Sequence, residues 1–410
     1  MRLTPPPITR TEDGPEGGEI VRELPDARGV LLWGALRDVL CWAAAPPRTR
    51  TGLFAADGST IRVREIRTHL ESSDDLAVPL LTLAMLTEEG DSADTARVVH
   101  ACRRLARWAE ACGAPGTRLA FTQAAALVRP EDASLALETA QLVRDSGDAA
   151  RAETWFRRTI KLARNRDWAN YVWAYIGLAV LYRRLGNLPA AMALAGRALR
   201  TATRHALPAL EGTALHHLFV ISSDAPDTTK LYGYASAALK AYGQDHPRLF
   251  ALAHDVAVYW TDQGRYAWAL PVLEAVVPDA SDPSLRALAY ASLARAAAGA
   301  GAAEVYDRAA RHAWGFLDLL PTGAGRGEVL MTLGRAAALA GEIDRAEEAL
   351  NAALRISAQR GEAQVRMIAE RELQTLHDQH REIPVRRVET VSAVQQAERL
   401  VVDLTTSLVG

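Results

Sequence analysis

The sequence predicts an all-α protein, a solenoid of stacked antiparallel helix pairs. The first observation behind this prediction is a glycine that is followed five residues later by an alanine. This spacing occurs at Gly147 and Ala152, Gly186 and Ala191, Gly264 and Ala269, and Gly341 and Ala346. The copies lie about 39 residues, or twice that, apart, which suits one helix pair of a repeat array. We expect each glycine to end one helix and each alanine to begin the contact face of the next.

The second observation is a pair of small or apolar residues shortly before each of these glycines. The pairs are Thr139 with Ala140, Leu178 with Ala179, Val256 with Ala257, and Leu333 with Gly334. Small side chains at these positions would allow two helices to approach closely. Because each repeat of such an array contacts only its neighbours, the chain is expected to form one continuous array rather than the single core of a globular enzyme.

The N-terminal part of the chain lies outside this repeat pattern. Residues 1–24 are rich in Pro, Gly and Glu and are predicted to be disordered, although Ile20, Val21 and Leu24 could dock on the folded part. Residues 25–94 are expected to form an N-terminal helical segment. Apolar residues follow a helical spacing at 31–42, 61–70 and 76–86.

Residues 95–381 are expected to form the solenoid and its C-terminal capping helix. A helix at 95–112 and its partner at 116–128 precede six clearer pairs. These are 132–146 with 148–165, 167–185 with 188–205, 207–223 with 226–242, 246–263 with 265–277, 282–299 with 301–319, and 323–340 with 342–359. The third and fifth pairs are irregular, because residues 222–226 contain no turn glycine and Gly299 and Gly301 blur the register. Residues 361–380 are predicted to be the cap.

Residues 382–410 are expected to be a linker followed by an amphipathic tail. Its apolar residues lie along one loosely helical stripe: Val388, Val391, Val394, Leu400, Val401, Leu404 and Leu408. This stripe could fold back on the chain as a latch, bind a partner, or form a homo-oligomer with a second copy.

At these positions the chain resembles the tetratricopeptide repeat family, in its long-helix bacterial variant. The resemblance rests on the glycines and alanines above together with Phe156, Tyr182, Trp260, Ala353 and Leu354. It covers residues 132–360 well and 95–130 weakly. The resemblance implies a right-handed superhelix in which the first helix of each pair lines a concave groove that binds peptides or proteins. The family has no shared catalytic activity.

Composition limits the classes of function. A net charge of −2 argues against a protein built to neutralise nucleic-acid phosphates, and no apolar run approaches the roughly 20 residues that span a membrane. Three cysteines are too few for a disulfide framework and fit a reducing compartment. Residues 1–23 lack the apolar core of a secretory signal, so we expect a cytoplasmic location. Alanine-rich and arginine-rich usage is typical of a bacterial genome of high GC content.

If the first helices line the groove, positions three, six and ten residues before each turn point inward. The candidate partner-binding residues at such positions are Gln141, Arg144, Ile176, Arg183, His216, His254, Arg295, Met331 and Arg335. Four arginines and two histidines on one wall would suit an acidic partner, because guanidinium binds carboxylate bidentately. The alternative is that these arginines pair with neighbouring acids of the chain itself.

No set of residues with catalytic or metal-binding spacing emerges. His377 and His380 share a helical face, but no third ligand stands at a required spacing. No cofactor is expected. The sequence therefore predicts a non-catalytic scaffold or adaptor that binds a protein or peptide. The alternative is a regulator whose repeat domain senses a ligand or peptide and controls assembly or a partner's activity.

Overall fold

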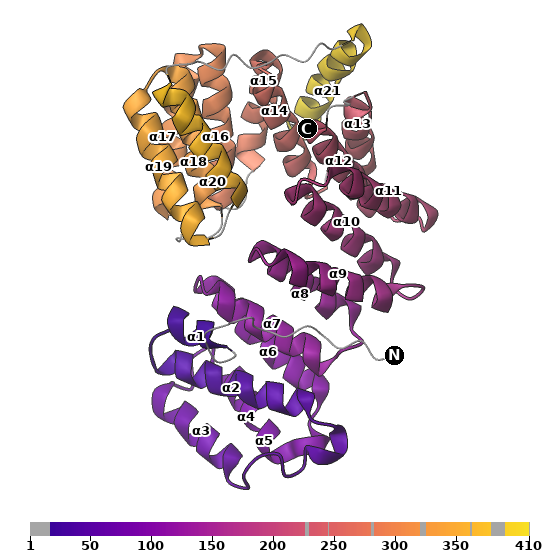
Figure 1. Ribbon diagram of the computed structural model, residues 1–410, viewed down its shortest axis with the longest axis vertical. Helices are drawn as coiled ribbons and strands as arrows, with labels where there is room; N and C mark the ends of the chain where they lie inside the picture. The colour runs from indigo at the N-terminus through magenta and orange to yellow at the C-terminus, as the bar shows by residue number, and fades with distance from the viewer. Residues whose placement is uncertain are drawn as a thin grey trace. The chain divides into compact units, whose positions relative to one another are not determined.

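The computed structural model describes residues 17–225, 229–244, 246–279, 283–319, 325–360, 363–378 and 390–409. These residues form helices and connecting turns, and none of them forms a β-strand. The chain divides into two compact units, Met1–Gly177 and Leu178–Gly410, which are called unit 1 and unit 2 below. The predicted all-α helical repeat fold is confirmed (Figure 1).

Unit 1 contains the N-terminal helices and the first helix pairs. Its helices are α1 (Gly18–Glu23), α2 (Ala27–Ala44), α3 (Gly58–His69), α4 (Ala77–Ala84), α5 (Leu86–Glu89), α6 (Thr95–Ala111), α7 (Pro115–Val128), α8 (Ala133–Asp145), α9 (Ala149–Ala163) and the first part of α10 (Trp168–Arg184), with short 3₁₀ turns at Pro47–Thr49 and Gly90–Ser92. Helix α4 packs on α6, and α2 packs on α7. The predicted boundary between residues 94 and 95 therefore does not separate two cores, because these helices share one.

Unit 2 contains the later pairs and the C-terminal helix. Its helices are the remainder of α10, then α11 (Leu188–Arg204), α12 (Pro208–Asp224), α13 (Leu231–Tyr242), α14 (Leu249–Asp262), α15 (Tyr266–Asp279), α16 (Pro283–Ala300), α17 (Ala303–Leu319), α18 (Arg326–Ala340), α19 (Ile343–Arg360), α20 (Ala363–His377) and α21 (Val391–Val409). Successive helices pack as pairs, and α14, α16, α18 and α20 also contact one another in order.

The turn glycines behave as the sequence predicts. Gly147, Gly186, Gly264 and Gly341 have φ values of 91°, 76°, 68° and 84°, in the left-handed region that glycine adopts without a steric cost. The alanine five residues after each of them is fully buried. In the irregular fifth pair, Gly301 is the turn glycine, with a φ of 72°, whereas Gly299 lies within α16 against the ring of Tyr266.

The prediction of disorder over residues 1–24 is wrong for Gly18–Glu23, which form α1, while residues 1–16 lie outside the described part. Ile20 is fully buried. The carboxylate of Glu23 accepts hydrogen bonds from the backbone N–H groups of Gly116 and Thr117, at 2.7 and 2.8 Å, and from the Thr117 hydroxyl at 2.7 Å. A side chain 93 residues away in sequence therefore caps α7, whose own N-cap residue, Ala114, has no side-chain acceptor.

The C-terminal amphipathic stripe folds back on the chain. Helix α21 packs against α13, α14 and α15, and Ala397, Leu400 and Leu404 are fully buried there (Figure 1). Of the alternatives predicted for the tail, the structure favours the intramolecular one. The face predicted to join a second copy is already occupied by the chain's own core, so the expected homo-oligomer through this stripe loses its physical basis. The linker at 379–389 lies outside the described residues.

Candidate partner-binding wall

All nine predicted binding residues lie on first helices of the pairs. Gln141 and Arg144 are on α8, Ile176 and Arg183 on α10, His216 on α12, His254 on α14, Arg295 on α16, and Met331 and Arg335 on α18. Gln141, Arg144 and Ile176 belong to unit 1, and the other six belong to unit 2. We call the side of α12, α14, α16, α18 and α20 that carries the unit 2 polar residues, together with Arg183 at the end of α10, the first-helix wall.

An arginine cluster occupies one part of the first-helix wall. Asp262 of α14 accepts hydrogen bonds from Arg295 of α16, at 2.5 Å, and lies 3.4 Å from Arg335 of α18. Arg335 also forms an ion pair with Glu372 of α20 at 2.9 Å. Burial alone would raise the pKa of Asp262, but the charges of Arg295 and Arg335 outweigh burial and hold this pKa below its usual value. The cluster therefore joins four successive first helices through charge.

A histidine cluster occupies the neighbouring part of the wall. Nε2 of His216, on α12, lies 2.9 Å from Oδ2 of Asp255 on α14. Nδ1 of His254 lies 3.5 Å from Oδ1 of the same Asp255, and its Nε2 lies 2.9 Å from the Ser292 hydroxyl of α16. Burial acts to raise the pKa of Asp255, yet its hydrogen bonds to the two histidines lower the pKa well below its usual value.

The remaining predicted residues divide into ion pairs and core residues. Arg144 pairs with Asp145 at 2.9 Å, and Arg183 pairs with Asp224 at 2.6 Å. Ile176 and Met331 are buried in the helix packing, so the prediction that they contact a partner is wrong. Gln141 is half-buried, and its role stays a prediction.

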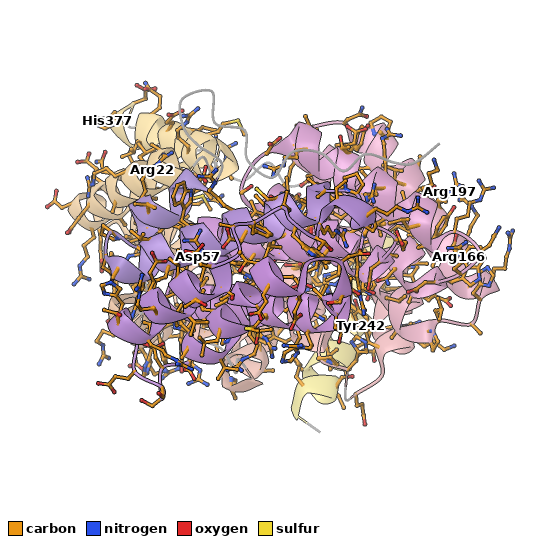
Figure 2. All side chains as sticks on the ribbon, turned by 90° about the horizontal axis from the view of Figure 1, so that it is seen from below. Arg22, Asp57, Arg166, Arg197, Tyr242 and His377 are labelled. Atoms are coloured by element: carbon orange, nitrogen blue, oxygen red, sulfur yellow. The ribbon has the colours of Figure 1, made fainter. Side chains whose placement is uncertain are left out.

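These pairs alter the expected chemistry of the wall. Each of Arg183, Arg295 and Arg335 already has a carboxylate of the chain as its partner, and the acidic partner expected for these arginines stays a prediction. Arginines away from these positions, such as Arg166 and Arg197, are exposed and extend outward from the ribbon (Figure 2). The alternative stated from the sequence, pairing with neighbouring acids, is the arrangement found.

Within the pairs, the acids are the more exposed members. The side chain of Arg295 is 9% exposed, whereas that of its partner Asp262 is 41% exposed. His216 is 4% exposed against 41% for Asp255, and Arg183 is 27% exposed against 41% for Asp224. Only the pair of Arg335 with Glu372, at 20% and 22%, is balanced. The first-helix wall therefore directs carboxylate oxygens to solvent and holds the arginine and histidine side chains beneath them.

Sequence reasoning identified the wall positions but missed the acids, Asp224, Asp255, Asp262 and Glu372. One signal could have revealed two of them. His216 and Asp255 are 39 residues apart, and Arg183 and Asp224 are 41 apart, so each acid lies about one repeat from its base. Charges of opposite sign separated by one repeat predict a contact between successive first helices.

No metal site or membrane span is found in the described residues. They contain no group of three or more His, Cys, Asp or Glu side chains placed to hold a metal ion. Among the helices described, none combines the length and apolar character that crossing a membrane requires. Burial raises the pKa of Cys102 to about 12, so this thiol stays protonated at neutral pH.

Stacked helix pairs with glycine turns and polar links between successive first helices define a helical repeat protein. Residues 131–204 match the family model described as tetratricopeptide repeat. This segment therefore carries the tetratricopeptide repeat pattern that the spacing of Gly147 to Ala152 and of Gly186 to Ala191 predicted. No curated protein matches the sequence.

Several solved structures resemble the chain. Aspartyl phosphate phosphatase F from Bacillus subtilis is 11% identical, with 85% of this chain and 96% of that chain covered and a TM-score of 0.50. BtubC (BKLC) from P. vanneervenii is 18% identical over 72% and 94% of the two chains, with a TM-score of 0.30. The TPR2AB domain of yeast Sti1, in complex with pHSP90, is 14% identical over 67% and 99%, with a TM-score of 0.25. At these identities the similarity to the phosphatase concerns the fold alone.

Proposed function

We propose that this protein is a non-catalytic scaffold that binds a segment of a partner protein along the first-helix wall of unit 2. The observation that supports this proposal is the orientation of the wall's ion pairs. Their carboxylates face solvent, while the guanidinium and imidazole groups lie beneath them. A pair oriented in this way keeps oxygen lone pairs free to accept further hydrogen bonds.

The chemistry of this wall favours a partner segment that carries lysine or arginine. Asp224 is the last residue of α12, Asp255 and Asp262 both lie on α14, and each of the three is 41% exposed. A cationic side chain can bind the outer side of such a carboxylate while the buried base keeps its inner side. An acidic segment would meet these carboxylates first and be repelled.

Fluorescence anisotropy with the full chain tests this proposal. The probes are two labelled 12-residue peptides of the same length and apolar residues, one with lysine and arginine and one with glutamate in their place. We expect the basic peptide to bind more tightly and its affinity to fall as salt is raised from 50 to 300 mM. The double variant Asp224→Asn/Asp255→Asn should weaken this binding about tenfold, by roughly 1.4 kcal/mol.

Asp91→Asn is the matched control, because Asp91 is exposed and belongs to unit 1, whereas the wall residues belong to unit 2. This variant should bind the basic peptide as the unmodified chain does. Two outcomes would exclude the wall as the cationic-segment site. In one, the glutamate peptide binds more tightly than the basic peptide. In the other, the double variant binds the basic peptide as tightly as the unmodified chain does.

One observation favours a second candidate, a regulator whose repeat domain senses a ligand or peptide and controls assembly or a partner's activity. Among its described residues, α21 is held to α13, α14 and α15 by apolar contacts, and its side-chain hydrogen bonds stay within the helix or its own N-cap. A helix docked in this way could be released when the wall is occupied. Amide hydrogen exchange of residues 391–409 should then become faster on addition of the basic peptide. Unchanged exchange would exclude the regulator and leave the scaffold as the proposed function.

A further inference from the structure

Unit 1 contains a cleft that the repeat pattern does not account for. It lies beside α2 and α3, outside the residues that match the repeat family, and has a volume of about 680 Å³. Trp33, Phe54, Ile66 and Leu80 are among its apolar lining residues, and Gly34 also lines it. A cleft of this size, with a largely apolar lining and several charged side chains beside it, is typical of a binding site rather than a packing defect.

The cleft follows the length of α2. Its lining residues on that helix extend from Ala27 to Cys41, and five of them, Ala27, Leu31, Gly34, Asp38 and Cys41, are spaced three or four positions apart. At the helical rise of 1.5 Å per residue, this row is about 21 Å long. The cleft is therefore a groove that runs along α2.

The rim of the groove carries large apolar side chains that remain in contact with solvent. Val30 is 57% exposed and Leu53 is 39% exposed, although both line the groove. A small molecule that contacted only the buried part of the groove would leave Val30 and Leu53 exposed to solvent. A helix lying over the groove would insert one row of side chains and cover the rim as well, so the rim favours a helix as the occupant.

Charge determines which helix fits best. The guanidinium of Arg37 lies 5.0 Å from the centre of the Trp33 ring, and no carboxylate of the described residues pairs with it. By contrast, Arg62, which also lines the groove, is bound to Asp38 at 2.8 Å and to Glu65 at 3.3 Å. Arg37 is thus an arginine of the groove that is open to a partner, and it fits a glutamate or aspartate.

We propose that this groove is a docking site for an amphipathic helix of a partner protein. That helix carries apolar residues at positions i, i+3 or i+4, and i+7, and an acidic residue beside them that binds Arg37. The site differs from the first-helix wall in position and in chemistry, since it takes an acidic, apolar helix where the wall takes a cationic segment. The chain then has two docking sites of opposite preference, one in each unit.

The test uses a displayed library of 16-residue helical peptides, selected on the full chain and measured by anisotropy. Gly34→Leu fills the groove, because a Cβ there meets only the Arg62 guanidinium carbon, at 4.0 Å. Leucine also favours a helix more than glycine does, so this variant should fold. The matched control is Gly233→Leu on α13, where an added Cβ meets nothing within 4 Å.

Enriched peptides should carry the apolar spacing together with an acidic residue. Their affinity should fall at least tenfold with Gly34→Leu and stay unchanged with Gly233→Leu. Arg37→Ala should remove the preference for the acidic residue while apolar binding persists. Equal binding by Gly34→Leu, or no enrichment over background, would overturn the proposal. A further outcome would also overturn the proposal: no peptide binds, but dodecanoate binds and Gly34→Leu abolishes that binding. The occupant of the groove would then be a small amphiphile.

Discussion

At the scale of single residues, Asp262 links first helices through charge. It lies between Arg295 and Arg335, so Asp262→Asn would leave two guanidinium groups facing each other without their shared carboxylate. Removing one member of a buried ion pair costs about 3–5 kcal/mol, but Asp262 is partly exposed, and we expect the free energy of unfolding to fall by about 1–3 kcal/mol at pH 7. Urea denaturation measures this difference.

The pKa of Asp262 gives this prediction a pH dependence with a defined sign. Because the folded-state pKa lies below the unfolded value of about 3.9, the ionised carboxylate stabilises the fold fully above that pH. This contribution is lost as the pH falls through the folded-state pKa. The stability difference between the unmodified chain and Asp262→Asn should therefore shrink below about pH 4. A difference that stays constant from pH 7 to pH 3 would show that the ion pairs contribute nothing.

Glycines within the helices act through close packing rather than through backbone freedom. A Cβ added at Gly334 of α18 would lie 2.6 Å from Cγ of Leu350 on α19. Overpacking of this kind costs about 1–3 kcal/mol, against a gain of about 1 kcal/mol in helix propensity. Gly334→Ala should therefore lower the melting temperature in circular dichroism. Gly233→Ala, on the open face of α13, should raise it slightly, and an equal rise in both variants would contradict the close approach.

The sequence predicted Gly334 as a small contact residue and the arginines as first-helix residues, because repeat spacing fixes where a residue lies on its helix. Spacing did not predict which charges meet. Asp262 contacts Arg295, 33 residues away, and also Arg335, so its partners depend on how successive repeats are rotated. That rotation follows from the packing between repeats, and the residue pattern of a single repeat does not specify this packing.

At the scale of elements, α21 completes the core of unit 2. Leu400 is fully buried against this core, so Leu400→Ala should destabilise the docked helix by about 2–4 kcal/mol. We expect faster amide hydrogen exchange in α21 and in the facing residues of α13 and α15. Val402→Ala is the matched control, since Val402 is 61% exposed and its truncation should change stability by less than about 0.5 kcal/mol.

The outcome at Leu400 also separates two interpretations of the tail. If α21 were an appendage that did not stabilise the core of unit 2, Leu400→Ala would leave amide hydrogen exchange in α13 and α15 unchanged. The sequence alone left this open, because the stripe of apolar residues is the same whether its partner is the chain itself or another molecule. Helix α1 shows the same limit: its capping role depends on Glu23 reaching the N-terminus of α7, a contact between distant segments.

At the scale of the whole molecule, the chain contains two compact units, and each has a different set of stabilising contacts. Trp42 is a fully buried residue of unit 1 and donates a hydrogen bond to the Gly90 carbonyl at 2.6 Å, while the charge clusters and α21 belong to unit 2. Repeat arrays are stabilised by nearest-neighbour contacts, so a change in one unit need not reach the other.

Calorimetry can therefore resolve the two units as separate unfolding transitions, because chains with more than one compact unit commonly depart from two-state behaviour. Trp42→Ala, which removes a buried indole at a cost of about 3–5 kcal/mol, should lower the temperature of one transition. Asp262→Asn and Leu400→Ala should each lower the other transition and leave the first in place. The assignment is checked by limited proteolysis of Trp42→Ala between the two temperatures, where cleavage should fall within residues 17–177. A single transition that all three variants shift equally would show that helix α10, within which the division falls, couples the two units into one cooperative fold.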